Sequence, residues 1–376
     1  MPLLFLLLSL LARAGDAPRP TSPHPTEGAD AAAPDDALDG EPTDARDAFL
    51  GWQRAAAGRL RQAWPQGHPE PAYRFAAEVY GAVAPVVAER PGVVAPFLVG
   101  TTVKGRPIWA FRVKRPGTTP DYKVLVFAGI HALEWISTEV GTSFLEEMLA
   151  HPPDNVELVV IPILNLDGRM RVEHDFKKDP PRPYRRANAN GVDLNRDFEV
   201  NRESDAVWKK IVPGFYEKSP SPLSQPESQA LDRLAAAERF DVSVSLHAFG
   251  GYIYYPWSGL YSPPKDQVAL HTLGRVMEHG QPTRPYQVKQ LSHWGFFFRA
   301  LGSELDHMYG KYGTLSYLIE LSRSGVEPFD RSTWKDYFRW YNPRDPDRVR
   351  AQGVGALHAM VGYLGWEGLP SPQRSQ

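Results

Sequence analysis

Residues 123–130 read KVLVFAGI, an apolar run of strand length that ends directly before His131 and a helix-forming stretch, 134–149. Further apolar runs of strand length lie at 156–164, 241–246 and 315–321. Strands that are apolar on both faces indicate a sheet covered by helices on each side. The sequence therefore predicts an α/β fold with a mixed, mostly parallel twisted sheet and helices on both faces. In such sheets, ligands bind beyond the carboxyl ends of the strands.

The composition restricts the class of protein. Of the 376 residues, 42% are hydrophobic, which is enough for a large buried core. The formal net charge is −2, so no strongly basic surface points to nucleic acid or an anionic membrane as a partner. Cysteine is absent, which excludes disulfide scaffolds, thiol catalysis and cysteine-bound zinc. Any metal ion must therefore be held by His, Asp or Glu.

The first 14 residues, MPLLFLLLSLLARA, predict a signal peptide. An apolar run from Leu3 to Leu11 precedes Ala12-Arg13-Ala14, which has the small-x-small form of a cleavage site. The run is too short to span a bilayer, and no other stretch approaches the ~20 apolar residues of a membrane helix. We therefore expect a secreted or periplasmic protein without a membrane span after signal removal. The alternatives are an apolar N-terminus that is no signal or an uncleaved anchor.

Composition divides the rest of the chain into four segments. Residues 15–46 are rich in Pro and Ala and carry eight acidic residues against two arginines, which predicts a disordered acidic tether. Residues 47–70 predict a short helical lead-in, because apolar residues recur there at helical spacing. Residues 71–366 contain all the strand and helix patterns of the α/β domain, and 367–376 predict a polar tail.

Three side chains with metal-binding chemistry follow or end predicted strands. His131 comes directly after the strand 123–130, and Glu134 lies three residues further on, where both can face one ion. His247 ends the strand that begins at 241. Two His and one carboxylate, with a fourth position for water, form a standard catalytic zinc set. His-x-x-Glu alone is a weak pattern, however, and His247 by itself could equally be a hydrogen-bonded core histidine.

Two further features are a glutamate inside an apolar strand and a loop rich in Arg and Asn. Glu320 lies inside the apolar strand 315–321, where burial would raise its pKa towards that of a general base. A structural ion pair with an arginine is the alternative. The segment 185–198 concentrates Arg and Asn, and guanidinium groups pair bidentately with carboxylates, so this loop suits an anionic group of a substrate. The alternative is that this segment is an ordinary surface loop whose charges are solvated.

Five motifs together resemble the zinc metallocarboxypeptidases of the carboxypeptidase A type, over a region from about Tyr73 to Leu364. In the family's order they are His131-Ala-Leu-Glu134-Trp, Asn165-Leu-Asp-Gly168, Asn190-Gly-Val-Asp-Leu-Asn-Arg196, Ser245-Leu-His247 and Ser316-Tyr-Leu-Ile-Glu320. The resemblance implies a zinc carboxypeptidase-like fold with 71–366 as the catalytic domain. It also implies hydrolysis of the C-terminal peptide bond of peptides that have a free carboxylate.

The resemblance also assigns the metal site and the base. It implies one Zn²⁺ ion held by His131, Glu134 and His247. Glu320 would be the general base. Asp193 would orient His131 from behind, the usual role of a carboxylate that contacts a ligating imidazole.

The resemblance places the substrate as well. Arg186 would polarise the scissile carbonyl, and Asn195 and Arg196 would bind the terminal carboxylate. Phe298 stands where the family usually has a mobile Tyr, so it can close over the site but cannot donate a hydrogen bond. Leu305 falls at the floor of the specificity pocket, where relatives that take C-terminal Lys or Arg carry a nearby acid. We therefore expect a preference for apolar or aromatic C-terminal residues.

Two other functions remain open at this point. A zinc-dependent amidase or deacylase acting on cell-wall peptides or acyl-amino acids would use the same site, and Asn195 and Arg196 would serve those substrates too. A catalytically silent binding module is the other alternative. Such a module is expected to have lost one of the three metal ligands or Glu320, and all four are present.

Overall fold

The computed structural model describes residues 44–178, 181, 183–323 and 330–370. The predicted signal peptide, the tether up to residue 43 and the last part of the polar tail, 371–376, lie outside the described residues. Within the described ranges, no helix combines the length and the apolar character needed to cross a bilayer.

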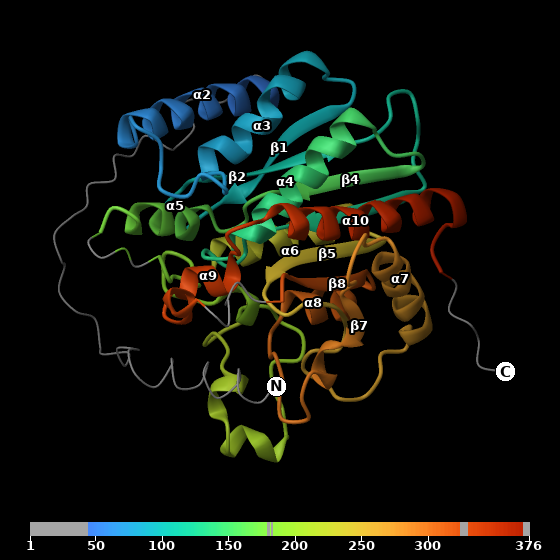
Figure 1. Ribbon diagram of the computed structural model, residues 1–376. Helices are drawn as coiled ribbons and strands as arrows, with labels where there is room; N and C mark the ends of the chain where they lie inside the picture. Colours follow the sequence, from blue (N-terminus) through green and yellow to red (C-terminus); the bar gives the residue numbers. More distant parts are fainter. Residues whose placement is uncertain (1–43, 179–180, 182, 324–329, 371–376) are drawn as a thin grey trace. The chain divides into compact units, whose positions relative to one another are not determined.

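A sheet of eight strands, in the order β1-β2-β4-β3-β5-β8-β6-β7, forms the centre of the described chain (Figure 1). The strands are β1 (Val94–Thr101), β2 (Pro107–Val113), β3 (Tyr122–Phe127), β4 (Val156–Ile161), β5 (Val242–Ala248), β6 (Tyr252–Tyr255), β7 (Gln287–Gln290) and β8 (Leu315–Leu321). The central strands β4, β3, β5 and β8 are parallel to one another. Antiparallel pairing occurs at β1–β2, β2–β4 and β6–β8. The predicted mixed, mostly parallel sheet is confirmed.

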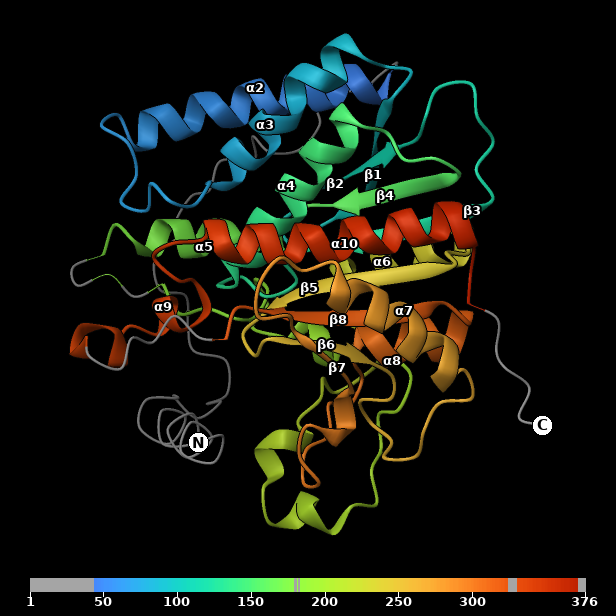
Figure 2. The ribbon, with the colours of Figure 1, turned by 45° about the vertical axis from the view of Figure 1, so that its right-hand side comes forward.

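Helices cover both faces of this sheet (Figure 2). They are α2 (Ala45–Ala63), α3 (Ala76–Glu89), α4 (Trp135–Ala150), α5 (Leu166–Asp175), α6 (Pro226–Glu238), α7 (Gln267–His279), α8 (Glu304–Tyr312), α9 (Tyr337–Tyr341) and α10 (Asp347–Glu367). Within β3, Val124 and Val126 belong to the core cluster that includes residues of α4, α7 and α10, whereas Leu125 and Phe127 belong to a second cluster that includes residues of α6 and α8. Both faces of the strand are thus buried, which explains its unbroken apolar sequence.

The sheet topology brings three polar side chains to one edge. β3, β5 and β8 are neighbours and run in the same direction, so their carboxyl ends lie together. His131 follows β3 after a short turn, His247 lies near the end of β5, and Glu320 lies near the end of β8. The register of β5 on β8 places His247 directly opposite Glu320.

An ion-pair cluster links the last turn of α6 to the strands. Arg112 Nη2 of β2 lies 2.7 Å from Glu238 Oε1, and Lys123 Nζ of β3 lies 2.8 Å from Glu238 Oε2. The hydrogen bond from Arg112, together with that from Lys123, lowers the pKa of Glu238 to about 2. The folded protein therefore favours the ionised carboxylate more strongly than the unfolded chain does.

Glu238→Gln is expected to destabilise the protein in a pH-dependent way. Because the folded pKa lies below the unfolded value of ~4.5, the cluster stabilises the fold above about pH 4.5, and this stabilisation is lost as the pH falls towards 2. After allowance for solvent screening of a partly exposed group, we expect a loss of ~1–2 kcal/mol at pH 7 and less than half of that at pH 3. Urea unfolding at both pH values measures it. Glu89→Gln, at an exposed position, is the control, and equal losses at the two pH values would contradict the prediction.

Candidate active site

His131, Glu134 and His247 converge at the carboxyl ends of β3 and β5. His131 and Glu134 lie in the turn between β3 and α4, and their potential ligand atoms and that of His247 all lie within 4.8 Å of one another. The exposed fractions of the three residues are 2%, 1% and 1%. The structure thus brings together, away from water, the three residues that the sequence suggested as metal ligands.

The separations between these atoms fit a single zinc ion. His131 Nδ1 lies 2.8 Å from Glu134 Oε1 and 3.1 Å from His247 Nδ1, and His247 Nδ1 lies 3.4 Å from Glu134 Oε2. Ligand atoms bound tetrahedrally at ~2.0–2.1 Å are roughly 3.3 Å apart. The donor set, two imidazoles and one carboxylate with a position left for water, also matches catalytic zinc sites.

The outer nitrogens of both imidazoles contact carboxylates. His131 Nε2 lies 3.0 Å from Asp193 Oδ1, and His247 Nε2 lies 3.0 Å from Glu304 Oε1. Since an ionised carboxylate only accepts hydrogen bonds, each imidazole donates from Nε2, and in the neutral form of each ring this leaves a lone pair on Nδ1. Burial lowers the pKa of His247, but Glu134 and Glu304 outweigh this and raise it to about 10. The geometry and the surrounding charge therefore favour a cation between the imidazoles.

Glu320 lies beside this cluster with a free oxygen. Its Oε2 is buried and has no hydrogen-bond partner among the described residues. Burial, and then repulsion from Glu134, raise the pKa of Glu320 to about 8. Within the described ranges Glu320 forms no ion pair with an arginine, which argues against the purely structural alternative.

Arg186 contacts the metal-ligand cluster from the loop before η1 (Leu194–Arg196). Its Nη1 lies 3.0 Å from Glu134 Oε1, and its Nε lies 2.8 Å from Asp193 Oδ2. The carbonyl oxygen of Arg186 accepts a hydrogen bond from Ala132 N at 3.0 Å, which fixes this loop beside the end of β3. The Arg186 side chain is 32% exposed, so the guanidinium lies where a substrate can reach it.

Asn195 and Arg196 lie in η1, next to the same cluster. The Asp193 side chain accepts a hydrogen bond from Asn195 N and so begins the helical turn. Asn195 is buried, and its Oδ1 accepts from Glu304 N at 3.1 Å. Burial raises the pKa of Asp193, but Arg186, then His131 and Arg196, lower it well below its usual value. Two arginines therefore flank this side of the metal-ligand cluster.

The proposed specificity-pocket residues lie in one apolar cluster. Leu305 is almost completely buried and packs in a cluster whose other buried members are Tyr254, Leu291, Ala300 and Leu318. Phe298 packs against this cluster, and its ring contacts that of Trp294 edge to face, with centroids 5.2 Å apart. The two positions taken from the resemblance thus belong to the same apolar cluster, Leu305 inside it and Phe298 packed against it.

Two acids beside Leu305 have different surroundings. Asp306 accepts hydrogen bonds from Ser258 N, Gly259 N and Asn201 Nδ2. These contacts hold its carboxylate against the loops that carry the donors. Glu304 instead contacts His247. Sequence reasoning missed this contact, because nothing in the local pattern at the start of a helix indicates which strand the side chain will face.

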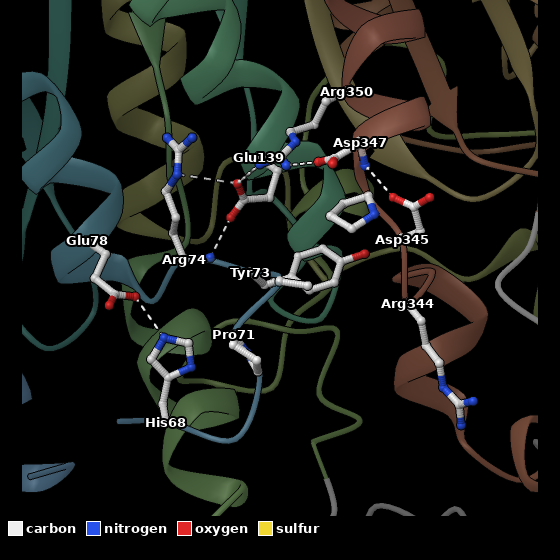
Figure 3. Close-up of a pocket in the computed structure, with 12 residues that line it drawn as sticks. His68, Pro71, Tyr73, Arg74, Glu78, Glu139, Arg344, Asp345, Asp347 and Arg350 are labelled. Carbon is white, nitrogen blue, oxygen red and sulfur yellow. Dashed lines mark hydrogen bonds and ion pairs between the residues drawn. The ribbon is translucent and has the colours of Figure 1, made fainter. Parts of the chain in front are cut away.

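A concavity of about 560 Å³ lies away from the metal-ligand cluster (Figure 3). None of the predicted site residues lines it. In its wall, Glu139 lies between Arg74 and Arg350, each 3.5 Å from Glu139 Oε2. Its charges largely pair with one another, so it does not compete with the metal-ligand cluster as the reaction site.

Comparisons of sequence agree with this geometry. Residues 80–338 match the family described as zinc carboxypeptidase. Carboxypeptidase O of Bos taurus is 24% identical over 291 residues, which cover 68% of this chain and 72% of that protein. Carboxypeptidase A2 of Mus musculus is 23% identical over 286 residues, which cover 69% and 64%.

Solved structures share the fold. Carboxypeptidase A from Helicoverpa armigera superposes with a TM-score of 0.60 at 21% identity, covering 84% of this chain and 80% of that chain. Bovine thrombin-activatable fibrinolysis inhibitor, solved with tick carboxypeptidase inhibitor, gives a TM-score of 0.62 at 20% identity and covers 78% and 97%. The matched region spans more than half of the sequence, and the chain belongs to the zinc carboxypeptidase family, as a metal-dependent peptidase that acts at the C-terminus of its substrates.

Proposed function

We propose that this enzyme removes the last residue of peptides with a free C-terminal carboxylate and prefers apolar or aromatic residues at that position. The observation that carries the proposal is the cluster of the three candidate ligands together with Glu320, which lies opposite His247 in the sheet and whose buried Oε2 has no hydrogen-bond partner among the described residues. The apolar cluster around Leu305 supports the preference.

His131, Glu134 and His247 would hold the zinc ion, which when bound supplies a Lewis acid and lowers the pKa of water. Glu320 would accept the proton of the attacking water and pass it to the leaving amine. Its pKa, raised to about 8 by burial and by Glu134, keeps the carboxylate basic enough for this transfer.

Arg186, Asn195 and Arg196 would position the substrate. Arg186 already donates to Glu134 and Asp193, so its guanidinium is held in a fixed place from which it can stabilise negative charge developing on the scissile carbonyl. Asn195 and Arg196 would bind the terminal carboxylate, since an arginine pairs with a carboxylate in a planar, directional geometry. Phe298 would close over the substrate through apolar contact alone.

Export from the cytoplasm is part of the proposal. It is supported by the form of residues 1–14, with an apolar run followed by Ala12-Arg13-Ala14. An exported enzyme would meet its peptide substrates in the periplasm or outside the cell.

Two blocked dipeptides that differ only in their last residue, Phe or Lys, and the C-terminal amide of the Phe peptide test the substrate assignment. We expect kcat/KM to be at least about 10-fold higher for a C-terminal Phe than for Lys, because the apolar pocket gives a lysine ammonium no partner. The amide of the Phe peptide should not be cleaved, because it lacks the carboxylate that Arg196 would bind. A preference for Lys would overturn the apolar pocket, and equal cleavage of the amide would overturn recognition of the C-terminus.

A further inference from the structure

We propose that Glu304 is a positioning residue that fixes His247 for metal binding and so increases the affinity of the site for zinc. This inference rests on the proposed function of the site. Glu304 is the first residue of α8 and is 1% exposed. Its Oε1 accepts hydrogen bonds from His247 Nε2 at 3.0 Å and from Ser245 Oγ at 2.6 Å. Its Oε2 has no hydrogen-bond partner among the described residues.

The backbone of Glu304 is held in place by a contact with η1. Glu304 N donates to Asn195 Oδ1 at 3.1 Å, which ties the start of α8 to η1. Ser303 Oγ accepts from Asp306 N and caps the same helix end. These two contacts fix the helix terminus from which the Glu304 carboxylate reaches β5.

The contact has a specific consequence for the imidazole. A hydrogen bond from Nε2 to a carboxylate fixes the tautomer that leaves Nδ1 unprotonated, fixes the ring orientation and makes Nδ1 a stronger donor to a metal. Asp193 accepts the corresponding hydrogen bond from His131 Nε2. The site thus has a carboxylate behind each imidazole, one from the loop before η1 and one from α8.

The charges around His247 give an independent reason to expect that Glu304 favours metal binding. Glu134, Glu304 and Glu320 are all buried or nearly so, and each approaches His247 or its neighbours. Within the described part of the chain, Glu304 forms no ion pair with Lys or Arg; its salt-bridge contact is with His247. When His247 is neutral, as a metal ligand must be, Glu304 is a buried carboxylate without a cationic partner, which is unfavourable. A divalent ion on the far side of His247 would supply the missing positive charge.

The test measures zinc affinity, by equilibrium competition with a chromophoric chelator, on the full-length protein. We expect Kd to rise about 10- to 100-fold in Glu304→Ala and by a smaller factor in Glu304→Gln, which keeps the shape of the side chain but not its charge. Ser245→Ala is the matched control, because it removes the other donor to the same oxygen, and its Kd should stay within about threefold of the wild type.

Cobalt loading separates positioning from a merely structural role. The visible absorption of the Co²⁺-substituted protein should shift in Glu304→Gln and remain unchanged in Ser245→Ala, since only the former alters His247. A variant with Gln or Ala at position 304 that binds zinc as tightly as the wild type, with the same cobalt spectrum, would overturn the inference. A wild-type protein that binds no zinc would instead overturn the proposed function, and this inference with it.

Discussion

Glu320→Gln is expected to lower kcat/KM for a blocked dipeptide with a C-terminal Phe by about 10³-fold or more and to leave zinc affinity nearly unchanged. A positioned general base contributes ~10²- to 10⁴-fold to the rate, and an amide of the same size cannot take up the proton. Glu320 is not among the three side chains whose ligand atoms converge, so the metal site should remain intact.

Steady-state kinetics of the zinc-loaded variant measure this effect. Glu139→Gln is a control at a buried glutamate away from the site, because Glu139 lines the concavity of Figure 3 and its Oε2 lies 3.5 Å from Arg74 and from Arg350. Its kcat/KM should stay within about threefold of the wild type. A Glu320→Gln enzyme that kept more than a tenth of the wild-type kcat/KM would remove Glu320 from the role of base.

His131→Ala is expected to raise the Kd for zinc by at least about 100-fold, because it removes one of three ligands and leaves Asp193 without its imidazole partner. At a zinc concentration of 100 times the wild-type Kd, the wild type should gain ~2.7 kcal/mol of stability. At that concentration the variant should gain less than ~0.5 kcal/mol. Denaturant unfolding with and without zinc measures both values, and equal stabilisation of the two proteins would contradict the assignment of His131.

The strands that carry the site could be predicted from sequence because each of them is buried on both faces. Residues 123–130 are a mainly apolar run for that reason, and His131 stood out because it follows directly where this run ends. Glu320 stood out in the same way within β8. Polar residues in otherwise apolar strands are visible without any knowledge of the tertiary structure.

The arrangement between elements could not be predicted in this way. The pairing of His247 with Glu320 depends on the register of β5 on β8, which is set by the packing of helices on both faces. The contact of Glu304 with His247 joins the start of α8 to β5, and no local pattern encodes it. The resemblance to a family supplied the roles of Arg186, Asn195 and Arg196, and the structure then gave their contacts.

The most direct test of the central claim is a zinc titration of the chelated wild-type protein with hydrolysis followed at each step. Cleavage of a peptide ending in a free Phe should be lost on chelation and should return in proportion to zinc up to one ion per chain. Undiminished cleavage by the metal-free protein would contradict the proposed function. So would a fully loaded protein that leaves every peptide with a free carboxyl end intact.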